Sequence, residues 1–175
     1  SLRNPENLNE DNGWARVSTG VSSLVDTNFY ITDQTGMNIS DICNQARRHK
    51  RDYPDCDLIA VDHVGLLDLE KSSGNRHDLQ VGEISRKLKM LAKELHTPVI
   101  LLTQLTGKQV MNRPVMEREP RAQDIKDSSR IEEDCDLMLL CHRQWTHDDT
   151  APNIAEIILA KARHAIKGTK VFFRF

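Results

Sequence analysis

Two polar residues in this sequence each follow a long apolar run, and their types are suited to chemistry at a shared site. Asp62 comes directly after the apolar run "LIAV", and Gln104 directly follows "VILLT". Ligands of a parallel α/β sheet bind beyond the carboxyl ends of its strands, which is where both residues stand. An aspartate after a hydrophobic strand is typical of a Walker B motif, which holds Mg²⁺ through water while the metal bridges nucleotide phosphates.

Both residues also have ordinary structural explanations. A buried strand often ends in Asp because the chain must turn there, and on this motif alone we favour that explanation for Asp62. Gln104 can equally be a capping or loop amide. The sequence contains no GxxxxGK[ST] phosphate-binding loop, since "GVSSLVDT" has no lysine and "TGKQ" lacks the first glycine and the final hydroxyl residue. If the fold is of the P-loop type, we expect its first strand and P-loop upstream of Ser1.

The elements that position these two residues can be predicted from apolar spacing. "LIAVD" and "VILLT" are continuous apolar runs, which suit parallel strands covered on both faces. Between them lies the clearest helix of the chain, which ends before Pro98 and carries an apolar face of Ile84, Leu88, Leu91 and Leu95. Strand, helix and strand predict a right-handed βαβ unit, which brings Asp62 and Gln104 to one edge of the sheet.

Two helices and a short strand are predicted before this unit. The first helix begins near Glu10, and its apolar face consists of Trp14, Val17, Val21 and Leu24. "NFYIT" then predicts a short strand. The second helix is capped by Asn38 or Ser40 and stopped by Pro54. Its apolar face consists of Ile39, Ile42, Cys43 and Ala46.

Three apolar runs follow the unit, "DLMLLC", "AEIILA" and "KVFFRF". Their connections are short, so we expect these strands to pair antiparallel at one edge of the sheet. The predicted fold class is therefore α/β, with a mostly parallel sheet flanked by helices and antiparallel edge strands. At 175 residues, one domain over residues 1–175 is the simplest organisation.

Composition excludes several classes of protein. A formal net charge of −2 with 29% charged residues predicts a soluble protein in which any nucleic-acid site is local. No apolar run reaches the roughly 20 residues that cross a bilayer, and the start of the chain is not a signal peptide, so we expect a cytoplasmic protein without a membrane partner. The four cysteines have no CxxC spacing and predict small core residues. His142 and His147 leave a metal site open, although polar surface histidines are the favoured explanation.

Four stretches taken together have the order and spacing of a known family: "LIAVDHVGLL", "VGEISRKLKMLAKELHTPVILLTQL", "DIKDSSRIEEDCDLMLLCHR" and "IAEIILAKARHAIKGTKVFF". From about Asn9 to its last residue the chain resembles the carboxyl-terminal RecA-like motor domain of the DnaB family of replicative helicases. The resemblance implies a RecA-like P-loop NTPase fold without its amino-terminal part. It also implies a homo-hexamer subunit that uses ATP and Mg²⁺ to move along single-stranded DNA, unwinding duplex 5′ to 3′.

The resemblance gives roles to residues near the nucleotide. Asp62 matches the Walker B aspartate that holds Mg²⁺ through water, although His63 stands where the family usually has Tyr. Gln104 matches the glutamine that senses the γ-phosphate and couples it to DNA contact, a role that suits an amide because it both donates and accepts. Lys161 and Arg163, in "AKARHAIKGT", match the two basic residues of the family's arginine-finger stretch "GKQRNGPIGT". The finger reaches the next subunit's nucleotide.

A further match is the family's DNA-binding loop "LRESGSIEQDAD", which corresponds to "IKDSSRIEEDCD". Lys126 stands for the phosphate-contacting arginine and keeps its charge but not its bidentate fork. Asp127 stands for the acidic neighbour, and Ser129 replaces a glycine whose backbone N–H meets DNA. Arg130 lies in the same loop. Without the resemblance, Lys126 and Arg130 would be explained as solvated surface residues.

Two family elements, the P-loop with its lysine and threonine and the catalytic glutamate, would lie upstream of Ser1. We therefore expect this chain alone to be catalytically inactive, and a monomer or weak oligomer. The resemblance leaves primase and a helicase loader open as partners. Two alternatives remain: a RadA/RecA-like recombination ATPase, and a non-catalytic remnant or interaction module with a RecA-like fold.

Overall fold

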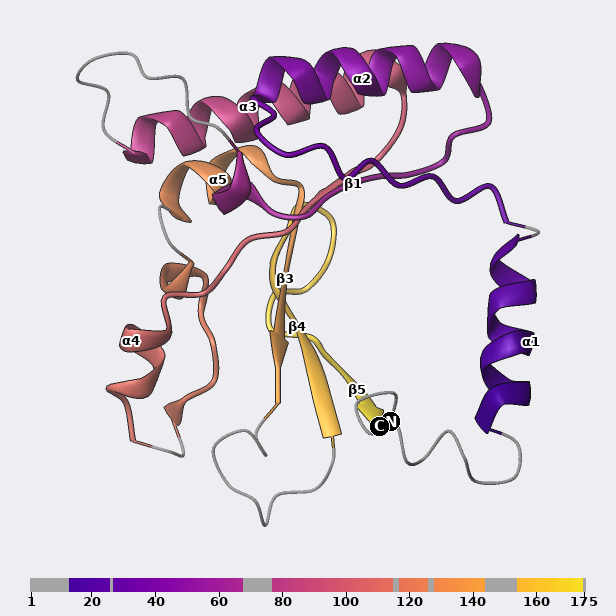
Figure 1. The fold of residues 1–175 in the computed structure, drawn as a ribbon. Coiled ribbons are helices and arrows are strands. Elements are labelled where there is room, and N and C mark those ends of the chain that lie inside the picture. The colour runs from indigo at the N-terminus through magenta and orange to yellow at the C-terminus, as the bar shows by residue number, and fades with distance from the viewer. Residues whose placement is uncertain are drawn as a thin grey trace. The chain divides into compact units, whose positions relative to one another are not determined.

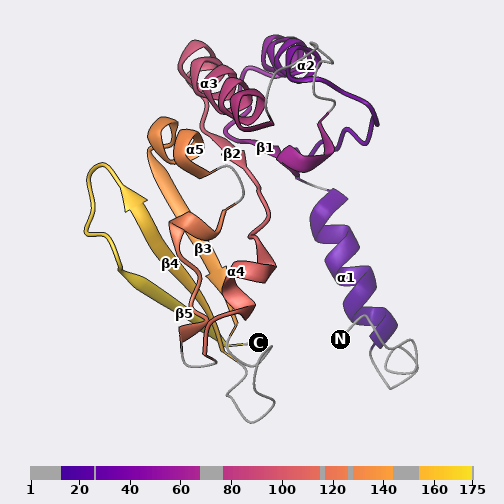
Figure 2. The ribbon, with the colours of Figure 1, turned by 90° about the vertical axis from the view of Figure 1, so that its left-hand side faces the viewer.

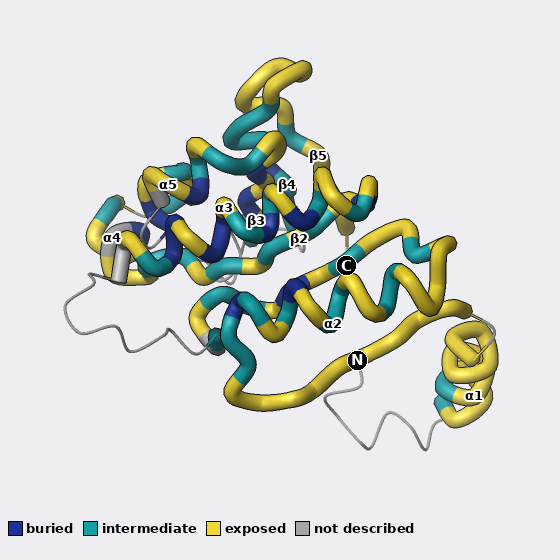
Figure 3. Tube along the Cα trace, turned by 90° about the horizontal axis from the view of Figure 1, so that it is seen from above, coloured by how far each residue is buried: buried dark blue, intermediate teal, exposed yellow. Residues whose placement is uncertain are grey.

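The computed structural model describes residues 13–25, 27–67, 77–114, 117–125, 128–143 and 154–174. The chain divides into two compact units, Ser1–Thr35 and Gly36–Phe175 (Figure 1). In the described part of the first unit the regular element is helix α1 (Gly13–Val25), which confirms the predicted helix; its expected start near Glu10 lies outside the described residues. No residue of α1 is buried (Figure 3), so its apolar face is not part of a core.

The strand predicted from "NFYIT" is wrong. Residues 28–32 have no regular structure, and the side chains of Phe29 and Ile31 are 70% and 76% exposed. A strand needs a ladder of hydrogen bonds to a neighbour, and no described strand pairs with this segment. The composition of the segment suits a strand, but composition does not supply the partner.

Helix α2 (Ile39–Asp52) opens the second unit and has a complete amino-terminal cap. The Oδ1 atom of Asn38 accepts hydrogen bonds from Ser40 N at 2.8 Å and Asp41 N at 3.0 Å, and Asp41 Oδ2 accepts from Asn38 N at 3.1 Å. This capping box selects Asn38 over Ser40 as the cap. The helix ends two residues before Pro54, as predicted.

The predicted strand–helix–strand unit is present. Strands β1 (Ile59–Val61) and β2 (Val99–Leu101) pair in parallel with Val61 opposite Leu101, and helix α3 (His77–Leu95) connects them through the chain. Helices α2 and α3 lie beside one another over this strand pair (Figure 2). The first core joins these elements, and its buried residues are Ile39, Cys43, Val61, Ile84, Leu88 and Leu91.

Helix α3 contributes to two cores, and this joins the two halves of the second unit. Leu91 is completely buried in the first core. Full burial of such a side chain stabilises the fold by about 1.5–3 kcal/mol. Val81, near the start of the helix, is buried in the second core, beside Ile125, Ile131, Met138, Leu140 and Ile158. Among the helices that the structure describes, none is both long and apolar enough to cross a membrane.

The remaining elements follow β2 and include a second sheet. They are α4 (Gly107–Met111), the 3-10 turn η4 (Ala122–Asp124), α5 (Ser128–Asp134), β3 (Leu137–His142), β4 (Ile154–Ala162) and β5 (Lys170–Arg174). Another 3-10 turn, η2 (Val64–Leu66), follows β1. The last three strands pair antiparallel in the order β3-β4-β5, as expected from their short connections.

The fold class is α/β as predicted, with one difference in how its strands are joined. We expected the antiparallel strands to continue the parallel sheet, whereas the described strands form two separate sheets, β1-β2 and β3-β4-β5. Among the described residues no strand lies between β2 and β3 to carry hydrogen bonds across. Helix α3 and the second core therefore connect the sheets by side-chain packing.

Candidate functional site

Asp62 lies at the carboxyl end of β1, and its side chain is 77% exposed. The chain remains hydrogen bonded beyond the strand ends, because Leu102 N donates to Val61 O at 3.0 Å and Val64 N donates to Leu102 O at 3.1 Å. These two bonds hold the segment after β1 against the segment after β2. The backbone at Asp62 is thus held by hydrogen bonds, and its carboxylate is exposed to solvent.

Gln104 follows the neighbouring strand β2 and is also exposed. Because β1 and β2 are parallel, both residues lie at the carboxyl edge of the strand pair, which is the arrangement that the sequence predicts. Immediately after Gln104, Leu105 forms an antiparallel bridge with Ile125, and Thr106 N donates to Asp124 O at 2.6 Å. The chain that carries Gln104 is therefore bonded directly to the chain that leads into the predicted DNA loop.

The predicted DNA loop is described only at its two ends. Ile125 is buried in the second core, whereas Lys126 and Asp127 lie outside the described residues. Ser129 and Arg130 are exposed in the first turn of α5. The side chain of Arg130 lies over α3 at Gly82, where an added Cβ would be 3.1 Å from Arg130 Cβ. The glycine thus lets α5 approach α3 closely.

A buried ion pair holds the chain between Gln104 and this loop. The side chain of Asp124 is fully buried, and Arg113 Nη1 donates to its Oδ2 at 2.9 Å while Nη2 binds Oδ1. Asp124 Oδ2 also accepts from Arg121 N at 2.7 Å, and Arg113 Nη1 donates to Glu119 O at 3.1 Å. The pair has the bidentate geometry and additional bonds that a buried charge requires. Sequence reasoning missed it, because an acid and an arginine in a polar stretch give no sign of burial.

Lys161 and Arg163 lie at the end of β4, in the antiparallel sheet. Lys161 Nζ donates to the backbone carbonyls of Glu132 and Glu133, the latter at 3.3 Å, and these carbonyls belong to the last turn of α5. A cation at the end of a helix satisfies carbonyls that have no partner within the helix. Lys161 therefore binds the helix that follows the predicted DNA loop.

Arg163 has a different partner, Asp136. Its Nε lies 3.1 Å from Asp136 Oδ1, and its backbone N donates to Asp136 O at 3.2 Å. The second carboxylate oxygen of Asp136 forms an ion pair with Lys89 of α3. The hydrogen bond from Lys89 holds the pKa of Asp136 below its ordinary value, and the positive charges around the carboxylate act in the same direction. Sequence reasoning did not single out Asp136.

The donors at the strand edge fit a water-bound Mg²⁺ better than a metal enclosed by protein. Mg²⁺ usually keeps several waters and binds through one or two carboxylates together with substrate phosphates. Asp62 supplies one exposed carboxylate, and the described residues contain no group of three or more His, Cys, Asp or Glu that could enclose a metal. A carboxylate of this kind can hold the ion through water.

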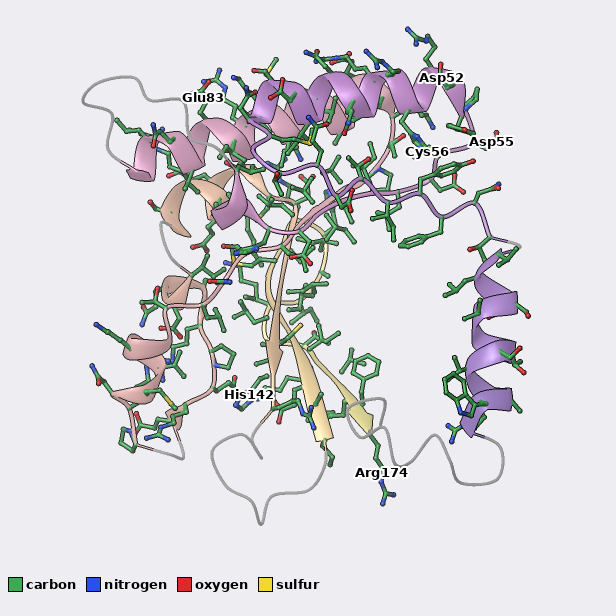
Figure 4. All side chains as sticks on the ribbon, viewed as in Figure 1. Asp52, Asp55, Cys56, Glu83, His142 and Arg174 are labelled. Carbon is green, nitrogen blue, oxygen red and sulfur yellow. The ribbon has the colours of Figure 1, made fainter. Side chains whose placement is uncertain are left out.

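The histidine and cysteine predictions have mixed outcomes. His142, at the end of β3 (Figure 4), has Nδ1 3.7 Å from Glu156 Oε2 of β4, while His147 lies outside the described residues. Their metal site stays untested.

All four cysteines are free thiols, and Cys43 is buried as expected of a core residue. Cys141 is exposed, which corrects the prediction for that residue, because it lies on the face of β3 opposite to the buried Met138 and Leu140.

Comparisons with known protein sequences agree with this geometry. The family model described as "DnaB-like helicase C terminal domain" matches residues 1–175. The chain is 37% identical over 174 residues to the replicative DNA helicase DnaB of Buchnera aphidicola subsp. Acyrthosiphon pisum, covering 96% of this chain and 36% of that protein. It is 34% identical to the replicative DNA helicase DnaC of Bacillus subtilis, covering 93% of this chain and 35% of that protein. The chain thus spans about a third of the length of these curated relatives.

Two solved structures are also similar. One, described as an ATPase domain, superposes with a TM-score of 0.86 at 28% identity, over 99% of this chain and 61% of that one. A DnaB-like replicative helicase, solved in a study of its interactions with primase, superposes with a TM-score of 0.85 at 29% identity, over 95% of this chain and 40% of that one. The arrangement of elements around the strand edge is therefore that of a RecA-like ATPase domain.

Proposed function

Because this chain belongs to the family of DnaB-like helicase C-terminal domains, we propose that it forms part of the motor of an ATP-dependent replicative DNA helicase. The motor moves along single-stranded DNA and unwinds duplex 5′ to 3′. The family match favours this function over that of a recombination ATPase. One observation supports it above the others: Gln104 at the ligand-binding edge is one residue from the bridge that leads to the predicted DNA loop.

At the nucleotide, Asp62 and Gln104 have separate roles. A bound Mg²⁺ would neutralise charge on the phosphates of ATP, and Asp62 is the residue that would hold it. Asp62 holds the ion through water from the end of β1, and the exposure of its carboxylate suits an ordered water between them. Gln104 contacts the γ-phosphate through its amide. Its neighbour Leu105 is bonded to Ile125, so a movement of Gln104 acts on the chain that enters the DNA loop.

At the DNA, Lys126 binds a phosphate, with Asp127, Ser129 and Arg130 in the same loop. Support for this role comes from the two fixed ends of the loop. Ile125 is buried on one side, and α5 is held on the other by Lys161. A cation on an anchored loop loses less conformational entropy when it binds a phosphate.

The finger residues Lys161 and Arg163 serve the nucleotide of a neighbouring subunit. Lys161 belongs to β4 of the antiparallel sheet and Arg163 directly follows that strand, whereas Asp62 and Gln104 follow the parallel strand pair. This separation supports action between the subunits of a homo-hexamer. A guanidinium that reaches the transferring phosphoryl group stabilises the charge that develops there. Primase and a helicase loader are further partners of the assembled protein, and we place it in the cytoplasm.

The chain by itself does not carry a complete ATPase site. Its 175 residues contain no GxxxxGK[ST] loop. We propose that the P-loop and the catalytic glutamate are supplied by a preceding part of a longer protein, and that the 175 residues alone do not hydrolyse ATP.

The test uses subunits of the full-length protein that carry different substitutions. Arg163→Ala should keep ATP binding and lower turnover by about 10³-fold or more, because a missing finger affects the transition state. Asp62→Ala should weaken Mg·ATP binding. Lys167→Ala, in the same exposed turn as Arg163, is the matched control and should leave both unchanged.

Mixing the Asp62→Ala and Arg163→Ala subunits then tests action between neighbours. An interface that combines the intact Asp62 of one subunit with the intact Arg163 of the next has both groups, so mixed rings should regain part of the ATP hydrolysis. Mixed rings that remain inactive would contradict a finger that acts across the interface. Unchanged hydrolysis by Arg163→Ala alone would remove the finger assignment, whereas a wild-type protein that does not hydrolyse ATP would favour a non-catalytic module.

A further inference from the structure

Asp136 stands directly opposite Arg163 in the antiparallel sheet. Leu137 and Ala162 are paired in the ladder between β3 and β4, and Asp136 and Arg163 are the residues just beyond that pair. Two contacts join them, the ion pair between Arg163 Nε and Asp136 Oδ1 at 3.1 Å and the backbone bond from Arg163 N to Asp136 O at 3.2 Å. The backbone bond fixes the base of the Arg163 side chain, and the ion pair fixes its guanidinium.

The carboxylate of Asp136 is itself held from the other side. Lys89, on α3, forms an ion pair with Asp136 Oδ2. The side chain of Lys89 is 22% exposed, and α3 is the helix that contributes to both cores. Asp136 therefore links the side chain of Arg163, which is 52% exposed, to helix α3 through Lys89.

The geometry of the pair leaves Arg163 able to act elsewhere. The carboxylate engages Nε, so the two terminal nitrogens of the planar guanidinium can still meet phosphate oxygens. Lys161 differs, because its single nitrogen is bonded to the carbonyls at the end of α5. Arg163 therefore offers a phosphate two terminal nitrogens in one plane, whereas the ammonium of Lys161 has one N–H donor left beyond its two carbonyl partners.

We propose that Asp136 is a positioning residue for Arg163: its carboxylate, fixed by Lys89, holds the guanidinium at the end of β4 in the orientation that meets the neighbouring subunit's nucleotide. The inference rests on the finger role proposed above for Arg163. A freely rotating arginine side chain gives up several rotamers when it binds, and one that is already oriented gives up fewer. Asp136 therefore contributes to turnover without touching the nucleotide.

The experiment compares Asp136→Asn with wild type in the full-length assembled protein. Loss of the charge should lower kcat for ATP hydrolysis by about tenfold while KM for ATP and affinity for single-stranded DNA stay within about twofold, since ATP and DNA are bound by other residues. Asp136→Glu, which keeps the charge, should recover part of the loss. Glu94→Gln is the matched control, because Glu94 also pairs with an arginine at similar exposure, but on the face between α2 and α3.

A double-mutant cycle separates positioning from general support of the fold. If Asp136 acts only through Arg163, adding Asp136→Asn to Arg163→Ala should lower the residual rate no further. Lys89→Met provides a second variant that leaves Asp136 in place and removes its support; it should lower kcat by a smaller factor. This variant keeps the test decisive if Asp136→Asn does not assemble.

The outcomes distinguish the inference from the proposed function. Full turnover in Asp136→Asn and in Lys89→Met, beside lost turnover in Arg163→Ala, overturns the positioning role and leaves the finger in place. Additive losses in the double mutant, or equal changes in kcat and KM, also overturn it. Full turnover in Arg163→Ala overturns the finger, and the positioning role with it.

Discussion

Single side chains near the candidate site are held by charges or carbonyls that lie far away in the sequence. Arg163 and Lys89 share the carboxylate of Asp136, and Lys161 binds carbonyls at the end of α5. Exposed ion pairs of this kind contribute little to stability, typically about 0–1 kcal/mol. Their value lies in orientation, because each fixes a long cationic side chain that would otherwise sample many rotamers.

The pKa of Asp136 tests whether Lys89 contacts its carboxylate. Its pKa is lowered in the folded chain by the hydrogen bond from Lys89. Such a carboxylate adds stability above its unfolded pKa of about 3.9, and this contribution is lost as the pH falls through the lowered folded pKa. An NMR titration should therefore place the midpoint of Asp136 below about 3.9 in wild type, and closer to it in Lys89→Met.

The matched control for this titration is Arg47→Met. Arg47 pairs with Glu94, so its loss should move the midpoint of Glu94 upward and leave that of Asp136 where it is. An identical Asp136 midpoint in wild type and Lys89→Met would contradict the direction assigned to the hydrogen bond.

Individual elements depend on a few local interactions that can be removed one at a time. Helix α2 is an example, because its first turn is closed by the capping box at Asn38. Asn38→Ala should lower the free energy of unfolding by about 0.5–2 kcal/mol, since two backbone N–H groups lose their acceptor. Ser40→Ala, at the other position that the sequence allowed for the cap, is the control and should change stability much less. Chemical denaturation monitored by circular dichroism measures both.

The segment between β2 and α5 depends on the buried pair of Arg113 and Asp124. Asp124→Ala removes one partner and leaves a buried guanidinium without its carboxylate, which should cost about 3–5 kcal/mol. Replacing both residues by Met and Leu should cost less than this single change, because no uncompensated charge remains. Urea unfolding curves of the two variants provide the comparison, and an equal loss in both would contradict the role of the pair.

Elements were predictable from the sequence where local patterns determine them. Helices α2 and α3 follow apolar spacing and prolines, and β1 and β2 follow continuous apolar runs, so the strand edge with Asp62 and Gln104 was predictable as well. The absence of the predicted strand at 28–32 and the separation of the two sheets could not be predicted, because both depend on which strands pair with one another. The partners of Lys161 and Arg163 could not be predicted from local sequence either, because such contacts join residues as far as 29 positions apart.

At the scale of the whole molecule, DNA binding should depend on local charge, because the chain has a net charge of only −2. Lys126→Ala in the full-length protein should weaken binding of single-stranded DNA and reduce the slope of log K against log salt by roughly 0.7, the value for one phosphate contact. Arg48→Ala, an exposed cation on α2, is the control and should leave the slope unchanged. An unaltered slope in Lys126→Ala would mean that this lysine contacts no phosphate.

The bridge between Leu105 and Ile125 also has a consequence for the speed of the proposed motor. Together with the hydrogen bond from Thr106 N to Asp124 O, it links the chain beside Gln104 to the chain before Lys126. Motions of loop segments take nanoseconds to microseconds, whereas collective movements of domains take microseconds to milliseconds. If the proposed roles hold, a change at the nucleotide should reach the predicted DNA loop of the same subunit before whole subunits move. In the proposed hexamer, rearrangement between subunits should therefore be slower than the signal within one subunit, and we expect it to limit the speed of stepping.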